Sequence, residues 1–132
     1  MQAIILCGGL ATRLGETTKT IPKILLEIAG KTVLEWQIRL LIEAGVTEVI
    51  LASGHLHDAL YEQVGTTYAG MCIRYAKEEE PLGTGGAIQN AMQQIQTSPF
   101  FVLNGDILLA NFSLKDMLIR FKQGKELSLI HI

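Results

Sequence analysis

The sequence predicts an α/β fold: a Rossmann-like, three-layer α/β/α domain built on a mainly parallel sheet. Short apolar runs alternate with helical patterns along the 132 residues, and this alternation is the signature of strands joined by crossover helices. Right-handed crossovers then place helices on both faces of the sheet. Ligands of such sheets bind beyond the carboxyl ends of the strands, where this sequence has several glycine-rich segments. We therefore expect one domain with a ligand site at that edge.

The apolar runs are expected to form short buried strands. The first run ends in Gly8-Gly9, as expected for a buried strand that is followed by a turn. The expected strands span residues 3–7, 49–52, 72–76, 100–103 and 127–132. Because the last of them reaches the final residue, we expect the domain to be truncated at its C-terminus.

The segments between these runs have the pattern of helices. The expected helices span residues 32–44, 57–64, 84–95 and 113 to about 122. Thr32 opens a capping-box pattern for the first helix, and Gly45 is the expected stop. Thr84 is expected to be the N-cap of the third helix, while Ser113 and Asp116 are expected to cap the fourth.

Composition excludes several classes of protein. A 48% hydrophobic content is enough for a core, and 18% charged residues are too few for a disordered chain. The net charge of −2 argues against a general nucleic-acid binder. No apolar run has the length of a membrane span or the flanks of a signal peptide. Cys7 and Cys72 both lie in apolar runs, so we expect buried free thiols in a reduced, cytoplasmic protein.

The segment after the first strand has the chemistry of a phosphate-binding loop. Two glycines, Gly8 and Gly9, let the backbone approach a ligand closely, and their N–H groups can cradle phosphate. Arg13 and Lys23 add cations to the same loop. The segment matches neither the standard phosphate loop nor the dinucleotide fingerprint. Alternatively, it is an ordinary turn with a solvated arginine and lysine.

The order of these residues resembles a known signature. Gly8-Gly9-x-x-Thr12-Arg13-Leu14, followed by Pro22-Lys23, resembles the signature of the sugar-1-phosphate nucleotidyltransferases. The resemblance implies a loop that wraps the triphosphate, with catalytic roles for Arg13 and Lys23. It implies nucleotide-binding roles for Leu6, Gly8, Gly9 and Thr12. The family usually has glycine where this chain has Ala11.

A second signature follows the third strand. Glu78 opens the run Glu-Glu-Glu-Pro-Leu-Gly-Thr, which resembles the guanylyltransferase branch of that family, above all heptose 1-phosphate and mannose 1-phosphate guanylyltransferases. The resemblance implies that Gly83 and Thr84 bind the nucleotide and that Glu78 reads the base. A carboxylate offers only acceptors, which match the adjacent N–H donors of guanine better than the mixed edge of uracil. Glu79 and Glu80 are expected to be solvated.

The third signature is Asn104-Gly105-Asp106, directly after the fourth strand. An aspartate at the carboxyl end of a strand is well placed to hold Mg²⁺, which takes one or two carboxylates together with phosphate oxygens and water. In the family this aspartate binds the metal, usually with a second aspartate from later in the chain. Alternatively, these three residues form an ordinary turn, because asparagine, glycine and aspartate are all typical of turns.

Together the signatures predict an enzyme, with residues 1–132 as the nucleotide-binding part and most of the sugar-binding part missing. The expected reaction transfers a nucleotidyl group from GTP to a sugar 1-phosphate, with Mg²⁺ and release of pyrophosphate. Catalysis would consist of positioning and charge neutralisation, without a protein nucleophile. Two alternatives remain: a UTP-dependent uridylyltransferase, and a non-catalytic nucleotide-binding or assembly module. A dehydrogenase-like domain has little support without the dinucleotide fingerprint.

Overall fold

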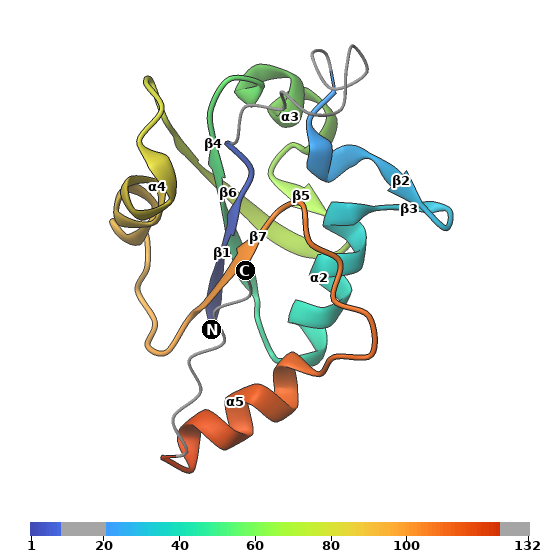
Figure 1. Cartoon of the computed structure of the whole chain (residues 1–132), viewed down its shortest axis with the longest axis vertical. Coiled ribbons are helices and arrows are strands. Elements are labelled where there is room, and N and C mark those ends of the chain that lie inside the picture. The colour runs from blue at the N-terminus through green and yellow to red at the C-terminus, as the bar shows by residue number, and fades with distance from the viewer. Residues whose placement is uncertain (9–20, 125–132) are drawn as a thin grey trace.

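A sheet of five strands runs through the centre of the computed structural model, which describes residues 1–8 and 21–124 (Figure 1). Four of these strands are parallel, and the short edge strand β5 is antiparallel to its neighbour. In spatial order the strands are β5 (Thr67–Tyr68), β6 (Met71–Lys77), β4 (Glu48–Ser53), β1 (Gln2–Leu6) and β7 (Phe101–Asn104). The four parallel strands lie at or within one residue of the predicted ranges.

The path of the chain creates a switch point at the centre of the sheet. From β1 the chain moves outward to β4 and then to β6, and it returns to place β7 on the other side of β1. The strand order therefore reverses between β1 and β7, and in open α/β sheets a ligand crevice lies beyond the carboxyl ends of the strands at such a point. Ile5 pairs with Leu103 and Leu6 with Asn104, so the two strands end side by side.

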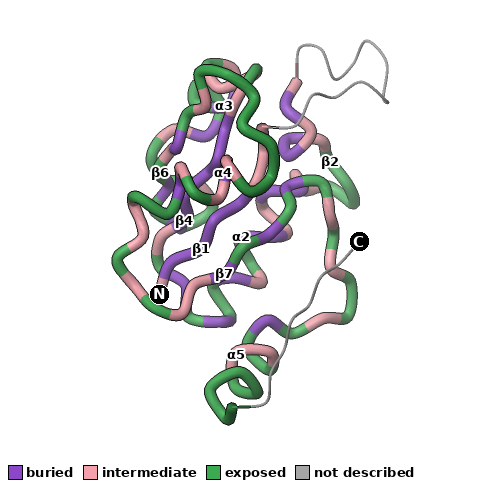
Figure 2. Tube along the Cα trace, turned by 60° about the vertical axis from the view of Figure 1, so that its left-hand side comes forward, coloured by how far each residue is buried: buried purple, intermediate pink, exposed green. Residues whose placement is uncertain are grey.

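Helices cover both faces of the sheet, as the sequence predicts. One face carries α2 (Val33–Glu43), α3 (His57–Val64) and α5 (Leu114–Lys122), and the other carries α4 (Gly83–Met92) (Figure 1). Side chains of β1 alternate between the two layers: Ala3 and Ile5 pack with the α2 side, whereas Ile4 packs with Ala87 and Ala91 of α4. Both faces of β1 and β4 are therefore buried (Figure 2).

Side-chain caps explain where two of the helices begin. The Thr32 hydroxyl accepts the Glu35 N–H at 3.1 Å, and the chain leaves α2 at Gly45 with a φ of +86°. The Ser113 hydroxyl accepts the Asp116 N–H at 3.1 Å, which caps α5. These caps confirm the predicted helix starts. The predicted range 57–64 matches α3 in full.

Two expectations about local structure are wrong. Thr84 is not the N-cap of α4: the helix starts at Gly83, the cap position is Leu82, and the helix ends at Met92. The Glu78 carboxylate accepts the Leu82 N–H at 3.1 Å, so a side chain from the preceding segment closes the turn before Thr84 is reached.

The second correction concerns Cys72, which is exposed rather than buried. Cys72 shares a face of β6 with Ala76 because side chains alternate along a strand. Ala76 is packed beneath α4, but that helix does not extend over the Cys72 end of β6. Cys7 is partly buried, and both thiols are free, as expected.

Several short elements have no counterpart in the prediction. They are the 3-10 turn η1 (Lys23–Leu25), the hairpin β2 (Glu27–Ile28) and β3 (Lys31–Thr32), and the edge strand β5. The predicted strand 127–132 lies outside the described residues. Across residues 1–8 and 21–124, no helix has the length and apolar character that a bilayer crossing requires.

Candidate functional site

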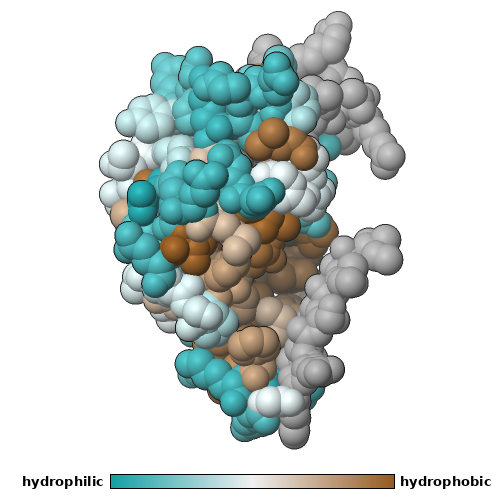
Figure 3. Space-filling view, turned by 90° about the vertical axis from the view of Figure 1, so that its left-hand side faces the viewer, coloured by the Kyte–Doolittle hydropathy of each residue, from teal (hydrophilic) through white to brown (hydrophobic). Residues whose placement is uncertain are grey.

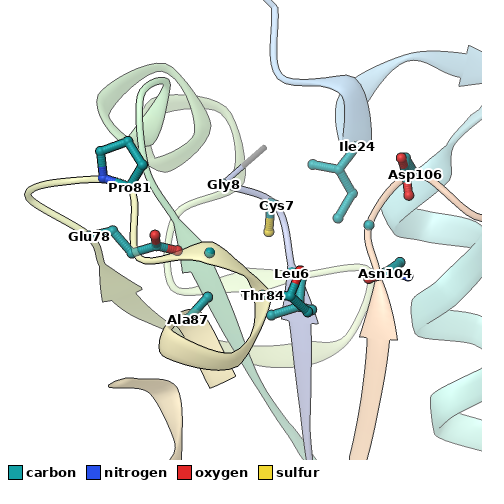
Figure 4. A pocket seen from close by; sticks show the side chains of 12 residues that line it. Leu6, Cys7, Gly8, Ile24, Glu78, Pro81, Thr84, Ala87, Asn104 and Asp106 are labelled. Carbon is teal, nitrogen blue, oxygen red and sulfur yellow. The ribbon is translucent and has the colours of Figure 1, made fainter. Parts of the chain in front are cut away.

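A pocket of about 340 Å³ lies at the carboxyl ends of β1 and β7, the switch point of the sheet (Figure 4). Its volume is at the lower end of the range for small-molecule sites, roughly 300–1,000 Å³. The lining residues come from the ends of β1 and β7, from the segments that follow β1, β6 and β7, and from η1. The lining residues are Leu6, Cys7, Gly8, Ile24, Glu78, Pro81, Gly83, Thr84, Ala87, Asn104, Gly105 and Asp106.

Most of the described site candidates therefore meet at one pocket. Leu6 and Gly8 form its floor at the end of β1, Glu78 stands on one side and Asp106 on the other (Figure 4). Gly9, Thr12 and Arg13 lie outside the described residues, so the roles predicted for them stay predictions. Lys23 starts η1 and is half-buried; its neighbour Ile24 lines the pocket, whereas Lys23 does not.

The turn after β7 is fixed by a close backbone approach. Gly105 donates its N–H to the Leu6 carbonyl oxygen at 2.8 Å. A Cβ atom on Gly105 would stand 2.7 Å from that same oxygen, closer than real Cβ contacts come. Only glycine fits there without a shift of β1 or β7. The turn then presents Asp106, which is exposed, at the rim of the pocket.

The position of Asp106 fits a magnesium ion whose other ligands come from substrate phosphates and water. The described residues contain no group of three or more histidine, cysteine, aspartate or glutamate side chains that could hold a metal by themselves. Mg²⁺ is usually bound by one or two carboxylates plus substrate phosphates and water, not by a cage made only of protein atoms. A single exposed carboxylate on the wall of a pocket therefore fits such an ion when phosphate supplies the other ligands.

Glu78 is tied to the loop that it opens. Its N–H donates to the Ser53 carbonyl oxygen at 2.7 Å, and one carboxylate oxygen accepts the Leu82 N–H at 3.1 Å. The other oxygen lies 3.0 Å from the position that a Cβ on Gly8 would occupy. A side chain at Gly8 would thus press against Glu78. One oxygen holds the turn, and the second remains an acceptor beside the end of β1.

The first turn of α4 adds a positive end to the same pocket. The early N–H groups of a helix have no partner within the helix and carry partial positive charge. Gly83, with a φ of +71°, and Thr84 stand at this end and line the pocket. A Cβ on Gly86 would stand 2.7 Å from Leu82 Cβ, so glycine lets the loop fold close to the helix.

The surroundings of the Cys7 thiol, at the floor of the pocket, favour its protonated form. Burial raises the pKa of Cys7 far above its ordinary value, and the negative charge of Glu78 raises that pKa further. The side chain therefore stays protonated at neutral pH, whereas the thiolate is the nucleophilic form.

Gln37 is a residue that the sequence analysis missed. It lies on α2 and is 1% exposed, and its amide nitrogen donates to the carbonyl oxygens of Asn104 and Ile107, at 2.7 and 2.8 Å. The signal in the sequence is a polar residue on the buried face of a helix, since Leu34, Ile38 and Gln37 are all buried. The two carbonyl groups that accept from it lie 67 and 70 residues away along the chain, so only the fold shows that they are neighbours of Gln37.

A second hollow of about 470 Å³ borders the pocket on the outer side of β7. Its walls are mainly apolar, and Leu6, Thr84 and Asn104 are common to both hollows. Figure 3 shows apolar side chains gathered in this area beside the hydrophilic surface of the α4 side. Among residues 1–8 and 21–124, β7 is an edge strand of the sheet, and the hollow lies beside it.

Comparisons with known proteins show which family this chain belongs to. The model of the family described as "Nucleotidyl transferase" matches residues 2–132. A D-glycero-alpha-D-manno-heptose 1-phosphate guanylyltransferase of Campylobacter jejuni is 44% identical over 106 residues, covering 80% of this chain and 48% of the relative. The mannose-1-phosphate guanyltransferase beta-B of Xenopus laevis is 39% identical over 132 residues, covering 96% of this chain and 36% of the relative. The chain thus spans about half or less of the length of these curated relatives.

Solved structures give the same picture of the fold. HddC from Yersinia pseudotuberculosis, complexed with GMP-PN, has a TM-score of 0.75 at 34% identity, with 92% of this chain and 53% of that chain covered. A UDP-glucose pyrophosphorylase complexed with UDP-glucose has a TM-score of 0.79 at 23% identity, with 94% and 54% covered. The second similarity concerns the fold alone. The predicted α/β class with a mainly parallel sheet is confirmed.

Proposed function

The chain belongs to the nucleotidyl transferase family, and from that premise we propose that its protein transfers a guanylyl group from GTP to a sugar 1-phosphate. The products are a GDP-sugar and pyrophosphate. The observation that carries the proposal is the pocket at the β1–β7 switch point, where Glu78 and the first turn of α4 face Asp106. The side with Glu78 and α4 offers groups suited to a nucleobase. The side with Asp106 offers a carboxylate suited to a metal ion that is also bound by phosphates.

The reaction needs no protein nucleophile. A phosphate oxygen of the sugar 1-phosphate attacks the α-phosphorus of GTP, a new P–O bond forms, and the bond to the bridging oxygen of the β-phosphate breaks. That oxygen leaves with pyrophosphate and carries the displaced electron pair. The attacking oxygen is already ionised at neutral pH, so no general base is required. The remaining work is to align the two phosphates and neutralise their charge.

The chain's own residues divide this work. Glu78 and the backbone of Gly83 would contact the base, and the backbone of Gly8 would contact phosphate. Asp106 would bind Mg²⁺ together with phosphate oxygens, and the bound ion supplies charge neutralisation at the α-phosphate. Arg13 and Lys23 would contact the triphosphate and the incoming phosphate. These last two roles rest on the resemblance of the loop signature.

The preference for GTP is supported by the chemistry of Glu78. One of its oxygens accepts the Leu82 N–H, and the other remains an acceptor next to Gly8. Guanine presents adjacent N–H donors, whereas uracil presents one donor between two acceptors, so an acceptor-only group favours guanine. The same preference is supported by relatives named as guanylyltransferases and by the complex of HddC with GMP-PN.

The direct test is pyrophosphate release by the full-length protein. It is incubated with Mg²⁺, with GTP or UTP, and with mannose 1-phosphate or D-glycero-D-manno-heptose 1-phosphate. We expect release with GTP and at least one sugar phosphate, and much slower release with UTP. Release with UTP alone would instead support a uridylyltransferase. Nucleotide binding without release from any pair would support a non-catalytic module.

A further inference from the structure

We propose that Gln37 is a positioning residue for the metal-binding turn: it holds the backbone on both sides of Asp106 and so sets the direction of that carboxylate. This inference rests on the proposed function, since it assumes that Asp106 binds the metal. Gln37 itself faces the turn from below, on α2, and contacts neither metal nor substrate in the proposal. Its role is therefore exerted through Asp106.

The contacts bracket the aspartate. The Gln37 amide nitrogen donates to the carbonyl oxygen of Asn104, two residues before Asp106, at 2.7 Å. It also donates to the carbonyl oxygen of Ile107, one residue after Asp106, at 2.8 Å. The turn's own hydrogen bond, from Ile107 N–H to the Asn104 carbonyl oxygen, is long at 3.4 Å. The two hydrogen bonds from Gln37 are shorter than the turn's own hydrogen bond and hold the two ends of the turn together.

A second tie fixes the turn to the sheet. Gly105 donates its N–H to the Leu6 carbonyl oxygen at 2.8 Å. The residue before Asp106 is thus held by β1, and the carbonyl groups on either side are held by α2. Asp106 is the part of the turn that is exposed and lines the pocket. The arrangement leaves the carboxylate accessible while its backbone is constrained from two directions.

The other end of the Gln37 amide carries a cost in stability. Its oxygen is buried and has no hydrogen-bond partner among residues 1–8 and 21–124. The orientation of the amide is fixed, because only its NH₂ group can donate to two carbonyl oxygens. An unpaired buried acceptor costs free energy, which the two hydrogen bonds from the other end of the amide must offset. We infer that the two donated bonds are retained for what they do to the turn.

Hydrogen bonds that hold a metal ligand in place commonly raise the affinity of the site for its metal. A ligand that is held in one orientation binds a metal more tightly, and loss of the supporting contact typically weakens metal affinity about 10- to 100-fold. Without Gln37, Asp106 would sample more orientations, and binding would cost more conformational entropy. The consequence would appear in metal affinity together with the local stability of the turn.

The test compares Gln37→Met with Gln2→Met in the full-length protein. Methionine matches glutamine in length but donates no hydrogen bond, and Gln37→Leu serves as a second variant that also favours a helix. Gln2 is a matched control because it too is buried and holds backbone, accepting from the N–H groups of Gln96 and Thr97. It lies at the start of β1, the opposite end of the sheet from the pocket.

Two readouts are measured for each variant. Amide hydrogen exchange of residues 104–107 in the metal-free protein reports how firmly the turn is held. Binding of Mn²⁺ in the presence of GTP, followed by electron paramagnetic resonance, reports metal affinity without turnover. For both Gln37 variants we expect faster exchange at 104–107 and Mn²⁺ affinity lowered about 10- to 100-fold. For Gln2→Met we expect neither change at the turn nor weaker Mn²⁺ binding.

Unchanged exchange, or faster exchange with unchanged Mn²⁺ affinity, would overturn the proposal, because Gln37 would then have no role or only a structural one. The same losses in Gln2→Met would overturn it as well, since they would reflect general destabilisation. Failure of the proposed function would look different: the unmodified protein would release no pyrophosphate, whereas the exchange and Mn²⁺ comparisons would still decide the role of Gln37.

Discussion

The carbonyl oxygen of Leu6 lies 2.7 Å from the point where a side chain on Gly105 would begin. This approach joins the ends of β1 and β7 and determines where Asp106 stands. Gly105→Ala is therefore expected to push the two strands apart and to destabilise the protein by about 1–3 kcal/mol, as overpacked sites do. Thermal unfolding measures the loss, and pyrophosphate release should fall with it.

Gly85→Ala is the matched control for this substitution. A Cβ on Gly85 would meet nothing within 4 Å, and Gly85 lies within α4. Alanine is a better helix former than glycine by roughly 1 kcal/mol, so this variant should not unfold at a lower temperature. Equal melting temperatures for Gly105→Ala and the unmodified protein would show that the close approach to Leu6 is not constraining.

Glu78 is expected to determine the choice of base. Glu78→Gln keeps an oxygen that can accept the Leu82 N–H but replaces the other acceptor by an NH₂ donor. A hydrogen bond to a charged group contributes about 1.5–3 kcal/mol, so the ratio of kcat/KM for GTP to that for UTP should fall roughly 10- to 100-fold. Steady-state kinetics with both nucleotides measures the ratio.

Glu79→Gln is the control for the base choice. The Glu79 side chain is 85% exposed and is not among the residues that line the pocket. It should leave the nucleotide ratio unchanged. If Glu78→Gln also leaves it unchanged, the assignment of Glu78 as the base-reading residue is wrong.

Asp106→Asn is expected to remove the metal site. An amide oxygen is neutral, so the shared Mg²⁺ would lose its charged protein ligand. We expect kcat/KM to fall about 100-fold or more, since the ion contributes several kcal/mol of charge stabilisation. Asp58→Asn, at an exposed position in the first turn of α3, should retain the activity. Full activity of Asp106→Asn at low Mg²⁺ would contradict the metal assignment.

The two cysteines should differ sharply in reactivity. Burial raises the pKa of Cys7, so its thiol stays protonated at pH 8, whereas Cys72 is exposed. Iodoacetamide should therefore modify Cys72 and spare Cys7 in the folded protein, and mass spectrometry can count the labelled sites. Labelling of Cys7 at the rate of Cys72 would show that the pocket floor is open to solvent.

The raised pKa of Tyr75 has a consequence at alkaline pH. Burial, followed by the nearby Tyr61 and Cys7, raises the pKa of Tyr75 to about 12. Between the ordinary tyrosine pKa of about 10 and this value, the unfolded chain releases the proton while the folded protein retains it. The folded state then binds more protons, so stability falls as the pH rises through this window. Tyr75→Phe should make the decline between pH 10 and 12 shallower, as measured by denaturant unfolding at each pH.

Local patterns in the sequence predict the framework of the fold well. The caps at Thr32 and Ser113 act within three residues, so the starts of α2 and α5 follow from the sequence alone. The parallel strands were predicted because continuous apolar runs are typical of strands buried on both faces. The two-residue strands β2, β3 and β5 were not, because so short a segment has no periodicity to read.

One error arises within a local turn, and the others arise where distant parts of the chain meet. The turn before α4 is closed by Glu78, so the capping rule applied to Thr84 alone gave the wrong start. Alternation along β6 shows that Cys72 and Ala76 share a face, but the end of β6 that α4 covers depends on the fold. Gln37 was missed for the same reason, since the carbonyl groups it holds belong to another layer.

The account depends most on one nucleotide being enclosed by two separate segments, residues 78–84 and 104–106. The most direct measurement is a crystal structure of the full-length protein with Mg²⁺ and a non-hydrolysable GTP analogue. We expect the guanine edge within hydrogen-bond distance of Glu78 and a metal ion bound jointly by Asp106 and the phosphates. A nucleotide bound elsewhere, or bound here with its phosphates directed away from Asp106, would contradict the account.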